Sequence, residues 1–169
     1  MNVDLALLAL RVAVGVVIMA HGLLKVGWVG KGGSIAGVTG WFSGLGLRPG
    51  LFWAWVAVLA EVGGGLITVL GLGGPIGPSI VAADLVVVTV VAHLPKGFWA
   101  HEGGWEFPVP VAAGAFAIAL IGNGRWSLDA VLGLTYPDQV VQVWAALMVV
   151  GVVIALVLHA TLAPKPKPA

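Results

Sequence analysis

The sequence lacks cysteine and carries little charge. Because none of its 169 residues is cysteine, disulfide bonds, thiolate catalysis, cysteine-ligated zinc and iron–sulfur clusters are all excluded. Redox chemistry would therefore require a bound cofactor or a partner protein. Charged residues make up 9% of the chain, and the formal net charge is +1. The clustered lysines and arginines that bind phosphates are missing, which excludes nucleic acid as a partner.

Apolar residues dominate the remainder. They account for 60% of the chain, with a mean hydropathy of +1.08, which is typical of an integral membrane protein surrounded by the lipid bilayer. A helix needs about 20 mostly apolar residues to span the bilayer. Five stretches meet or approach this length: residues 5–29, 51–72, 76–94, 105–121 and 139–162. We therefore predict an all-α fold, an integral membrane four-helix bundle with an additional C-terminal transmembrane helix.

The segments between these stretches predict the domain organisation. Residues 34–45 carry apolar side chains at helical spacing, which predicts a short helix lying flat in the membrane interface. Residues 71–78 are rich in glycine and proline and predict a tight turn between antiparallel helices. We expect the bundle and its interfacial helix in residues 1–134, the additional transmembrane helix in residues 135–163, and a disordered tail in residues 164–169.

Basic residues in the loops predict the orientation of the chain. In a five-span arrangement only Arg125 falls in the loops of one side. The other side collects Lys25, Lys31, Arg48, Lys96, Lys165 and Lys167. Because lysine and arginine in short loops stay cytoplasmic, we expect the N-terminus outside and the C-terminus in the cytoplasm.

Three ionisable residues at membrane depth form the first candidate site. His21 and Lys25 are four residues apart and project from one side of the first span. An antiparallel second span could present Glu61 to that side. Ionisable residues inside membrane helices are rare and often functional, so we interpret these three as candidates for ligand binding or proton relay. The alternative is a buried polar clamp that only holds two helices together.

Two further charges predict a structural contact. Counted from the opposite membrane surface, Arg11 and Asp84 reach similar depths in the first and third spans. We expect them to form a buried structural pair that fixes two helices in register, because removing either partner would leave an uncompensated charge.

The loop after the third span is rich in polar residues. It contains His93, His101, Glu102 and Glu106, and it lies on the same side as Lys25. This composition predicts a loop that covers a binding pocket, with His93, His101 and Glu102 as further candidates for ligand binding or proton relay. An ordinary solvated loop has the same composition. We expect no metal site, because His93 and His101 are eight residues apart across a proline and lack the usual helical ligand spacing. A haem between His21 and His93 is geometrically feasible, but two lone histidines are a weak signal and we do not expect one.

Several of these residues together resemble a known family. Arg11, the phrase His21-Gly22-x-x-Lys25, the stretch at residues 60–66 and the loop at residues 93–106 are similar in order and spacing to the DoxX family of small membrane proteins. The resemblance covers roughly residues 5–134. It implies a four-helix membrane bundle in which Arg11, His21, Lys25 and Glu61 occupy the family's motif positions. Residues 139–162 depart from that four-helix pattern.

The resemblance also implies a redox setting. Some family members are linked to thiosulfate:quinone oxidoreductase or to membrane oxidoreductase assemblies. We therefore expect a redox-associated accessory or quinone-interacting subunit in a bacterial plasma membrane, with a membrane or soluble oxidoreductase as partner and quinone as the compatible cofactor class. No complete catalytic constellation is present, so catalytic residues remain unassigned. The alternative is a non-catalytic membrane scaffold or assembly factor.

Overall fold

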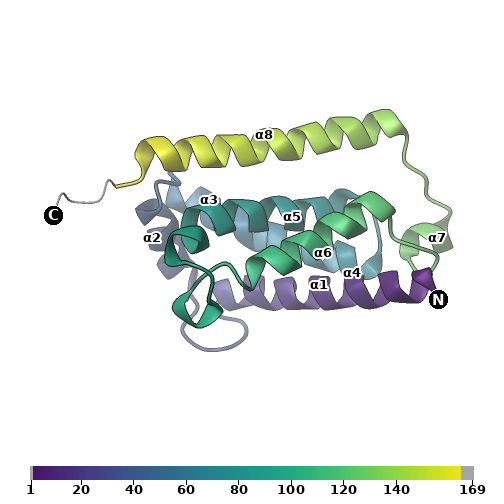
Figure 1. Ribbon diagram of the computed structural model, residues 1–169, viewed down its shortest axis with the longest axis horizontal. Coiled ribbons are helices and arrows are strands. Elements are labelled where there is room, and N and C mark those ends of the chain that lie inside the picture. Colours follow the sequence, from purple (N-terminus) through teal and green to yellow (C-terminus); the bar gives the residue numbers. More distant parts are fainter. Residues whose placement is uncertain (1, 165–169) are drawn as a thin grey trace.

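The computed structural model describes residues 2–164, and within that range every regular element is a helix. The long helices run side by side along one axis of the molecule (Figure 1). This arrangement confirms the predicted all-α membrane bundle. Most of the predicted tail at residues 164–169 lies outside the described residues, as do Lys165 and Lys167.

The chain forms helices of very different lengths. The longest are α1 (Val3–Lys25) and α8 (Asp138–Leu162). The second span joins α3 (Gly50–Leu59), η1 (Ala60–Gly64) and α4 (Gly65–Leu70), and the third joins α5 (Ile76–Val88), η2 (Thr89–His93) and η3 (Leu94–Lys96). The remaining helices are α2 (Ile35–Gly44), η4 (Ala100–Glu102), α6 (Pro108–Ile121) and α7 (Leu128–Leu132).

Within residues 2–164, four helices are long and apolar enough to cross a membrane: Val3–Lys25, Gly50–Leu70, Ile76–Lys96 and Asp138–Leu162. The stretch predicted as a short fourth span is α6, which has 14 residues. At about 1.5 Å per residue, this helix is shorter than the roughly 30 Å hydrocarbon core. Its first residue, Pro108, follows a loop whose backbone N–H and C=O groups form hydrogen bonds with one another. The helix therefore begins later than residue 105, the start predicted from the apolar pattern. It packs along α5.

Glycines allow the first two spans to approach closely. A Cβ atom added to Gly15 of α1 would lie 2.6 Å from the backbone oxygen of Gly65, and one added to Gly22 would lie 2.6 Å from Val62. Small residues at helix contacts let two backbones come close together. The van der Waals contacts that result stabilise the helix pair in lipid, where the hydrophobic effect does not drive helices together. The close contact brings the C-terminal half of α1 against η1.

The buried apolar side chains form two clusters. The first lies between α1, α5 and α6, and the second lies where α2 and α3 meet η2 and α8. The members of the first are Val14, Ile18, Val81, Ala82, Leu85, Ala115 and Ile118. The members of the second are Phe42, Leu47, Ala54, Ala57, Val91, Ala92 and Ala155. The second cluster ties α2, which occupies residues of the predicted interfacial helix, to one end of the bundle.

The last helix, α8, lies along α5 on one side of the bundle (Figure 1). Two hydrogen bonds attach it. Near its start, Trp144 Nε1 donates to Ser79 Oγ at 2.8 Å. Near its end, His159 Nδ1 lies 2.7 Å from the carbonyl oxygen of Leu45. These attachments hold α8 against the bundle at both ends.

Candidate functional site

An ion pair links the first two spans. The Nζ atom of Lys25, at the end of α1, donates a hydrogen bond to Oε2 of Glu61 in η1. Both side chains are largely buried, with 18% of Lys25 and 5% of Glu61 exposed. Each charge therefore compensates the other in an environment where an isolated charge would be costly.

The helix geometry around this pair is irregular. Glu61 lies in the π-helical segment η1, and His93 lies in a second π-helical segment, η2. Such segments insert an extra residue into a helical turn and occur frequently at functional sites. The glycine run at residues 63–65 is a sequence signal for the irregularity in η1, whereas no comparable signal marks η2.

Asp84 belongs to this site, which corrects the sequence prediction. It lies on α5, which packs against η1, and its carboxyl group is within electrostatic range of both Glu61 and Lys25. The predicted pair between Asp84 and Arg11 is wrong. The site therefore holds two carboxyl groups near the middle of the second and third spans, together with the ammonium group of Lys25 from the end of α1.

Arg11 points to the opposite half of the bundle. Its guanidinium donates to the carbonyl oxygen of Val69 at 3.1 Å and to that of Trp126. The side chain is fully buried, and Asp129 provides the opposite charge nearby. The predicted pair of Arg11 with Asp84 depends on their similar depth, but depth does not determine the direction in which a helical side chain points.

His21 is close to the ion pair but separate from it. Its imidazole is exposed at the surface of α1 and stacks on the ring of Phe107, with centroids 5.0 Å apart and planes at 27°. Lys25 and His93 lie within electrostatic range. Among residues 2–164, hydrogen bonding joins only Lys25 and Glu61 of the three candidates. The structure thus brings two of the three into direct contact and leaves the imidazole at the edge.

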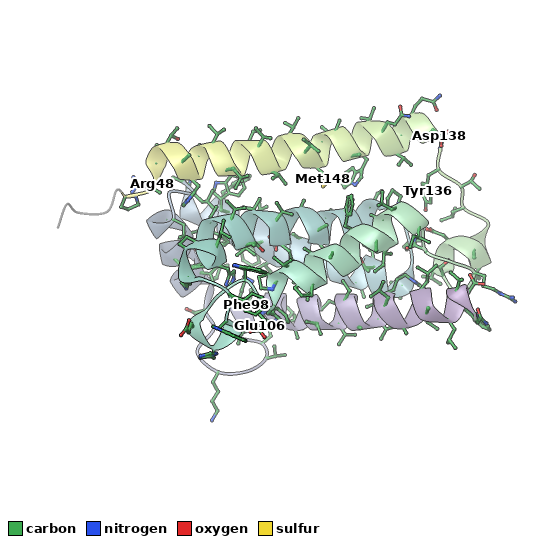
Figure 2. All side chains as sticks on the ribbon, viewed as in Figure 1. Arg48, Phe98, Glu106, Tyr136, Asp138 and Met148 are labelled. Carbon is green, nitrogen blue, oxygen red and sulfur yellow. The ribbon has the colours of Figure 1, made fainter. Side chains whose placement is uncertain are left out.

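The loop after η2 closes on itself near this end of the bundle. His93 Nδ1 lies 2.6 Å from the carbonyl oxygen of Gly103, and the backbone N–H of Ala100 donates to Oε2 of Glu106 at 2.8 Å. His101 and Glu102 are exposed and 3.9 Å apart. Figure 2 shows Glu106 and the neighbouring Phe98 in this loop. His93 is therefore held by a contact with the loop itself, whereas His101 and Glu102 are exposed at its surface.

A cavity opens beside the charged group. It has a volume of about 400 Å³ and lies between α3, α5 and α8, with apolar side chains over most of its wall. Asp84 is the one ionisable residue among those that line it. Met148 borders the cavity from the side of α8 that faces the bundle (Figure 2). No sequence pattern indicates this cavity, because it depends on how α8 packs against the bundle.

A second polar cluster, also missed, lies at the opposite end. Asp129 of α7 accepts hydrogen bonds from the N–H groups of Gly73 (2.9 Å) and Gly74 (2.8 Å). It also accepts from Asn123 Nδ2 and the Tyr136 hydroxyl, each at 2.7 Å. Burial alone would raise the pKa of Asp129, but these hydrogen bonds outweigh burial and lower it. The polar residues between positions 123 and 138 were the available signal.

Within the described residues, no three or more histidine or acidic side chains are grouped so that they could hold a metal ion. The candidate site is a set of charged side chains bordered by an apolar cavity. Its possible chemistry is hydrogen bonding and proton exchange at membrane depth.

The fold and this site define a multi-pass helical membrane protein with a buried charged group to which its first three spans each contribute one residue. The chain belongs to the DoxX family: the family model described as DoxX matches residues 6–94, just over half of the chain. No curated protein and no solved structure matches it. The matched region includes every residue of the charged group, whereas α6, α7 and α8 lie beyond it.

Proposed function

We propose that this protein is a redox-associated accessory subunit that interacts with quinone in a bacterial plasma membrane. The observation that carries the proposal is the position of Asp84, which lies beside the Lys25–Glu61 pair and also borders the apolar cavity. A quinone needs both environments, because its tail is apolar and its ring carbonyls accept hydrogen bonds. Membership of the DoxX family supports the redox setting.

The charge balance of the site favours proton exchange. Lys25 can neutralise only one of the two carboxyl groups, Glu61 and Asp84. A second negative charge at this depth is unfavourable, so the carboxyl group that Lys25 does not pair, that of Asp84, holds a proton. A carboxyl group that holds a proton next to an apolar cavity can donate it to a bound carbonyl and recover it afterwards.

His21 and His93 could connect the site with water. They lie within electrostatic range of each other at the end of the bundle that carries Lys25, and the loop of residues 94–107 adjoins them. Imidazole side chains commonly act as proton relays. In this proposal the end of the bundle with His21 and His93 faces the cytoplasm, and the N-terminus is outside. Electrons come from a membrane or soluble oxidoreductase partner.

The test uses the carboxyl group that pairs with Lys25. Protein purified gently from native membranes should carry about one quinone per chain. Glu61→Gln should lose partner-dependent quinone reduction even when it is assayed below its own, lowered melting temperature, and the double variant Lys25→Met/Glu61→Gln, which leaves no charge unpaired, should lose it as well. Glu102→Gln is the matched control because Glu102 is exposed in the loop. Wild-type protein that carries neither quinone nor a visible chromophore would contradict the proposal.

A second candidate function is a non-catalytic scaffold. It is favoured by exposed aromatic residues near the end of the bundle that carries Lys25, where Trp28 is 79% exposed and Trp99 is 54% exposed. Exposed aromatic side chains are common at protein contacts. If Glu61→Gln retains quinone reduction while Trp28→Ala or Trp99→Ala abolishes capture of the native partner, the scaffold is the better description.

A further inference from the structure

The cavity between α3, α5 and α8 has the properties of a ligand site. Its volume of about 400 Å³ lies within the range of roughly 300–1,000 Å³ that is usual for small-molecule pockets. Trp53 and Val56 line it from α3, and Val152 lines it from α8. Such walls suit the apolar part of a ligand and leave its polar end to a single side chain.

That side chain is Asp84. It is the one ionisable residue on the cavity wall, and within residues 2–164 no hydrogen bond or ion pair joins its carboxyl group to another side chain. The neighbouring ammonium group of Lys25 is already bonded to Glu61. Asp84 therefore offers an unsatisfied polar group to whatever occupies the cavity, which is a costly arrangement without a partner.

The cavity opens sideways toward lipid. Its rim includes Phe52 of α3 and Ile154 of α8, which are 58% and 50% exposed. Above and below this opening, α8 is attached through Trp144 and His159. A ligand can therefore enter from the bilayer between α3 and α8 while both attachments of α8 remain in place.

The charge count selects the chemistry of the ligand. With Lys25 paired to Glu61, a charged Asp84 would leave one negative charge uncompensated at membrane depth. Asp84 in its protonated form avoids this charge and presents an O–H donor to the cavity. The complementary ligand group is then an uncharged acceptor, such as a carbonyl oxygen, and not a cation.

We propose that this cavity binds one membrane-soluble molecule whose polar end carries a carbonyl oxygen that accepts a hydrogen bond from Asp84. The apolar remainder packs between α3 and α8 and continues into the bilayer. Quinones and ester lipids both carry such carbonyl groups. The choice of a quinone as the ligand rests on the proposed function.

The binding test uses native mass spectrometry of the full chain in detergent with three uncharged probes and one cationic probe, dodecylamine. Decylubiquinone and dioleoylglycerol carry carbonyl groups, and dodecylbenzene carries none. We expect one carbonyl-bearing probe to bind at one molecule per chain and dodecylbenzene to bind at least tenfold more weakly. Dodecylbenzene binding as tightly as both carbonyl probes, or no probe binding, would overturn the proposal.

Two pairs of variants locate the site. Gly151 borders the cavity, and an added Cβ there meets no heavy atom within 4 Å, so Gly151→Leu should fill the space and weaken binding at least tenfold. Ala146→Leu makes the similar change on an exposed part of α8 and should bind as wild type does. Asp84→Asn keeps a donor and should retain binding, whereas Asp84→Leu should lose it about tenfold.

The outcomes separate this inference from the proposed function. If dioleoylglycerol binds in a Gly151-dependent way and decylubiquinone does not, the cavity assignment stands and the quinone function fails. If quinone binds and Gly151→Leu has no effect, the function stands and the cavity assignment fails. Tighter binding of dodecylamine than of either carbonyl probe, abolished by Asp84→Asn, would show a charged Asp84 and overturn the proposal.

Discussion

At the scale of single residues, the protein neutralises its buried cations in two different ways. Lys25 forms an ion pair with Glu61. Arg11 instead donates to the backbone carbonyl groups of Val69 and Trp126, and Asp129 lies near enough to attract its charge. A planar guanidinium with five donors suits several acceptors at once, whereas an ammonium on a flexible stem suits a single carboxylate.

Removing one member of the ion pair should cost more than removing both. Lys25→Met leaves the Glu61 carboxyl group buried without a partner, and loss of one partner of a buried pair typically costs about 3–5 kcal/mol. The double variant Lys25→Met/Glu61→Gln should recover most of this loss. Thermal unfolding in detergent measures the difference, and equal melting temperatures for the single and double variants would contradict a buried pair.

The Asp129 cluster predicts a pH-dependent contribution to stability. Because hydrogen bonds lower the pKa of Asp129 in the folded protein, its contribution is present above the ordinary aspartate pKa and is lost as the pH falls through the lowered value. Asp129→Asn should cost about 1–3 kcal/mol near neutral pH. The difference from wild type should shrink in acid. Glu102→Gln is the control, and a difference that grows in acid would contradict the assignment.

At the scale of elements, glycine contacts and π-helical segments position the charged group. Gly22 lets α1 approach η1 so closely that an added Cβ would lie 3.0 Å from the Cβ of Glu61 and 2.6 Å from a methyl group of Val62. The distance between Lys25 and Glu61 therefore depends on the absence of a side chain one turn away. Helix packing and the ion pair are coupled at this position.

A larger residue at that glycine should separate the two helices. Gly22→Leu should lower the melting temperature and weaken the Lys25–Glu61 contact, because neither the Val62 side chain nor the η1 backbone can move without repacking. Gly40→Leu in α2 is the matched control, since an added Cβ there meets no atom within 4 Å. If both variants melt at the same temperature as wild type, the close contact does not limit stability.

At the scale of the whole molecule, the two ends of the described chain lie at opposite ends of the bundle (Figure 1). An odd number of crossings would produce this arrangement. Lys31 and Arg48 lie in the connections at the same end as Lys25, whereas Arg125 lies at the end near Asp4, whose carboxylate accepts from its backbone N–H at 2.9 Å. The distribution of basic loop residues is the basis for the predicted orientation.

The absence of cysteine makes this orientation directly measurable. A single cysteine introduced by Arg125→Cys should react with a membrane-impermeant maleimide on intact cells, because we predict that loop to be outside. One introduced by Lys31→Cys should react only after the membrane is permeabilised. Both wild-type residues are exposed, so accessibility does not limit labelling. The reverse labelling pattern would contradict the predicted orientation.

By itself, the sequence determined the fold class, because the length and apolarity of each segment decide whether it can span a bilayer as a helix. It also indicated which charges lie at membrane depth, since each residue adds about 1.5 Å to a helix. The partners of those charges were decided only by the tertiary structure. The rotation of each helix depends on close contacts such as that of Gly22 with Val62 and on the extra residues in η1 and η2. For that reason Lys25 contacts Glu61, while His21 lies at the surface. For the same reason Asp84 faces the cavity beneath α8 and does not contact Arg11.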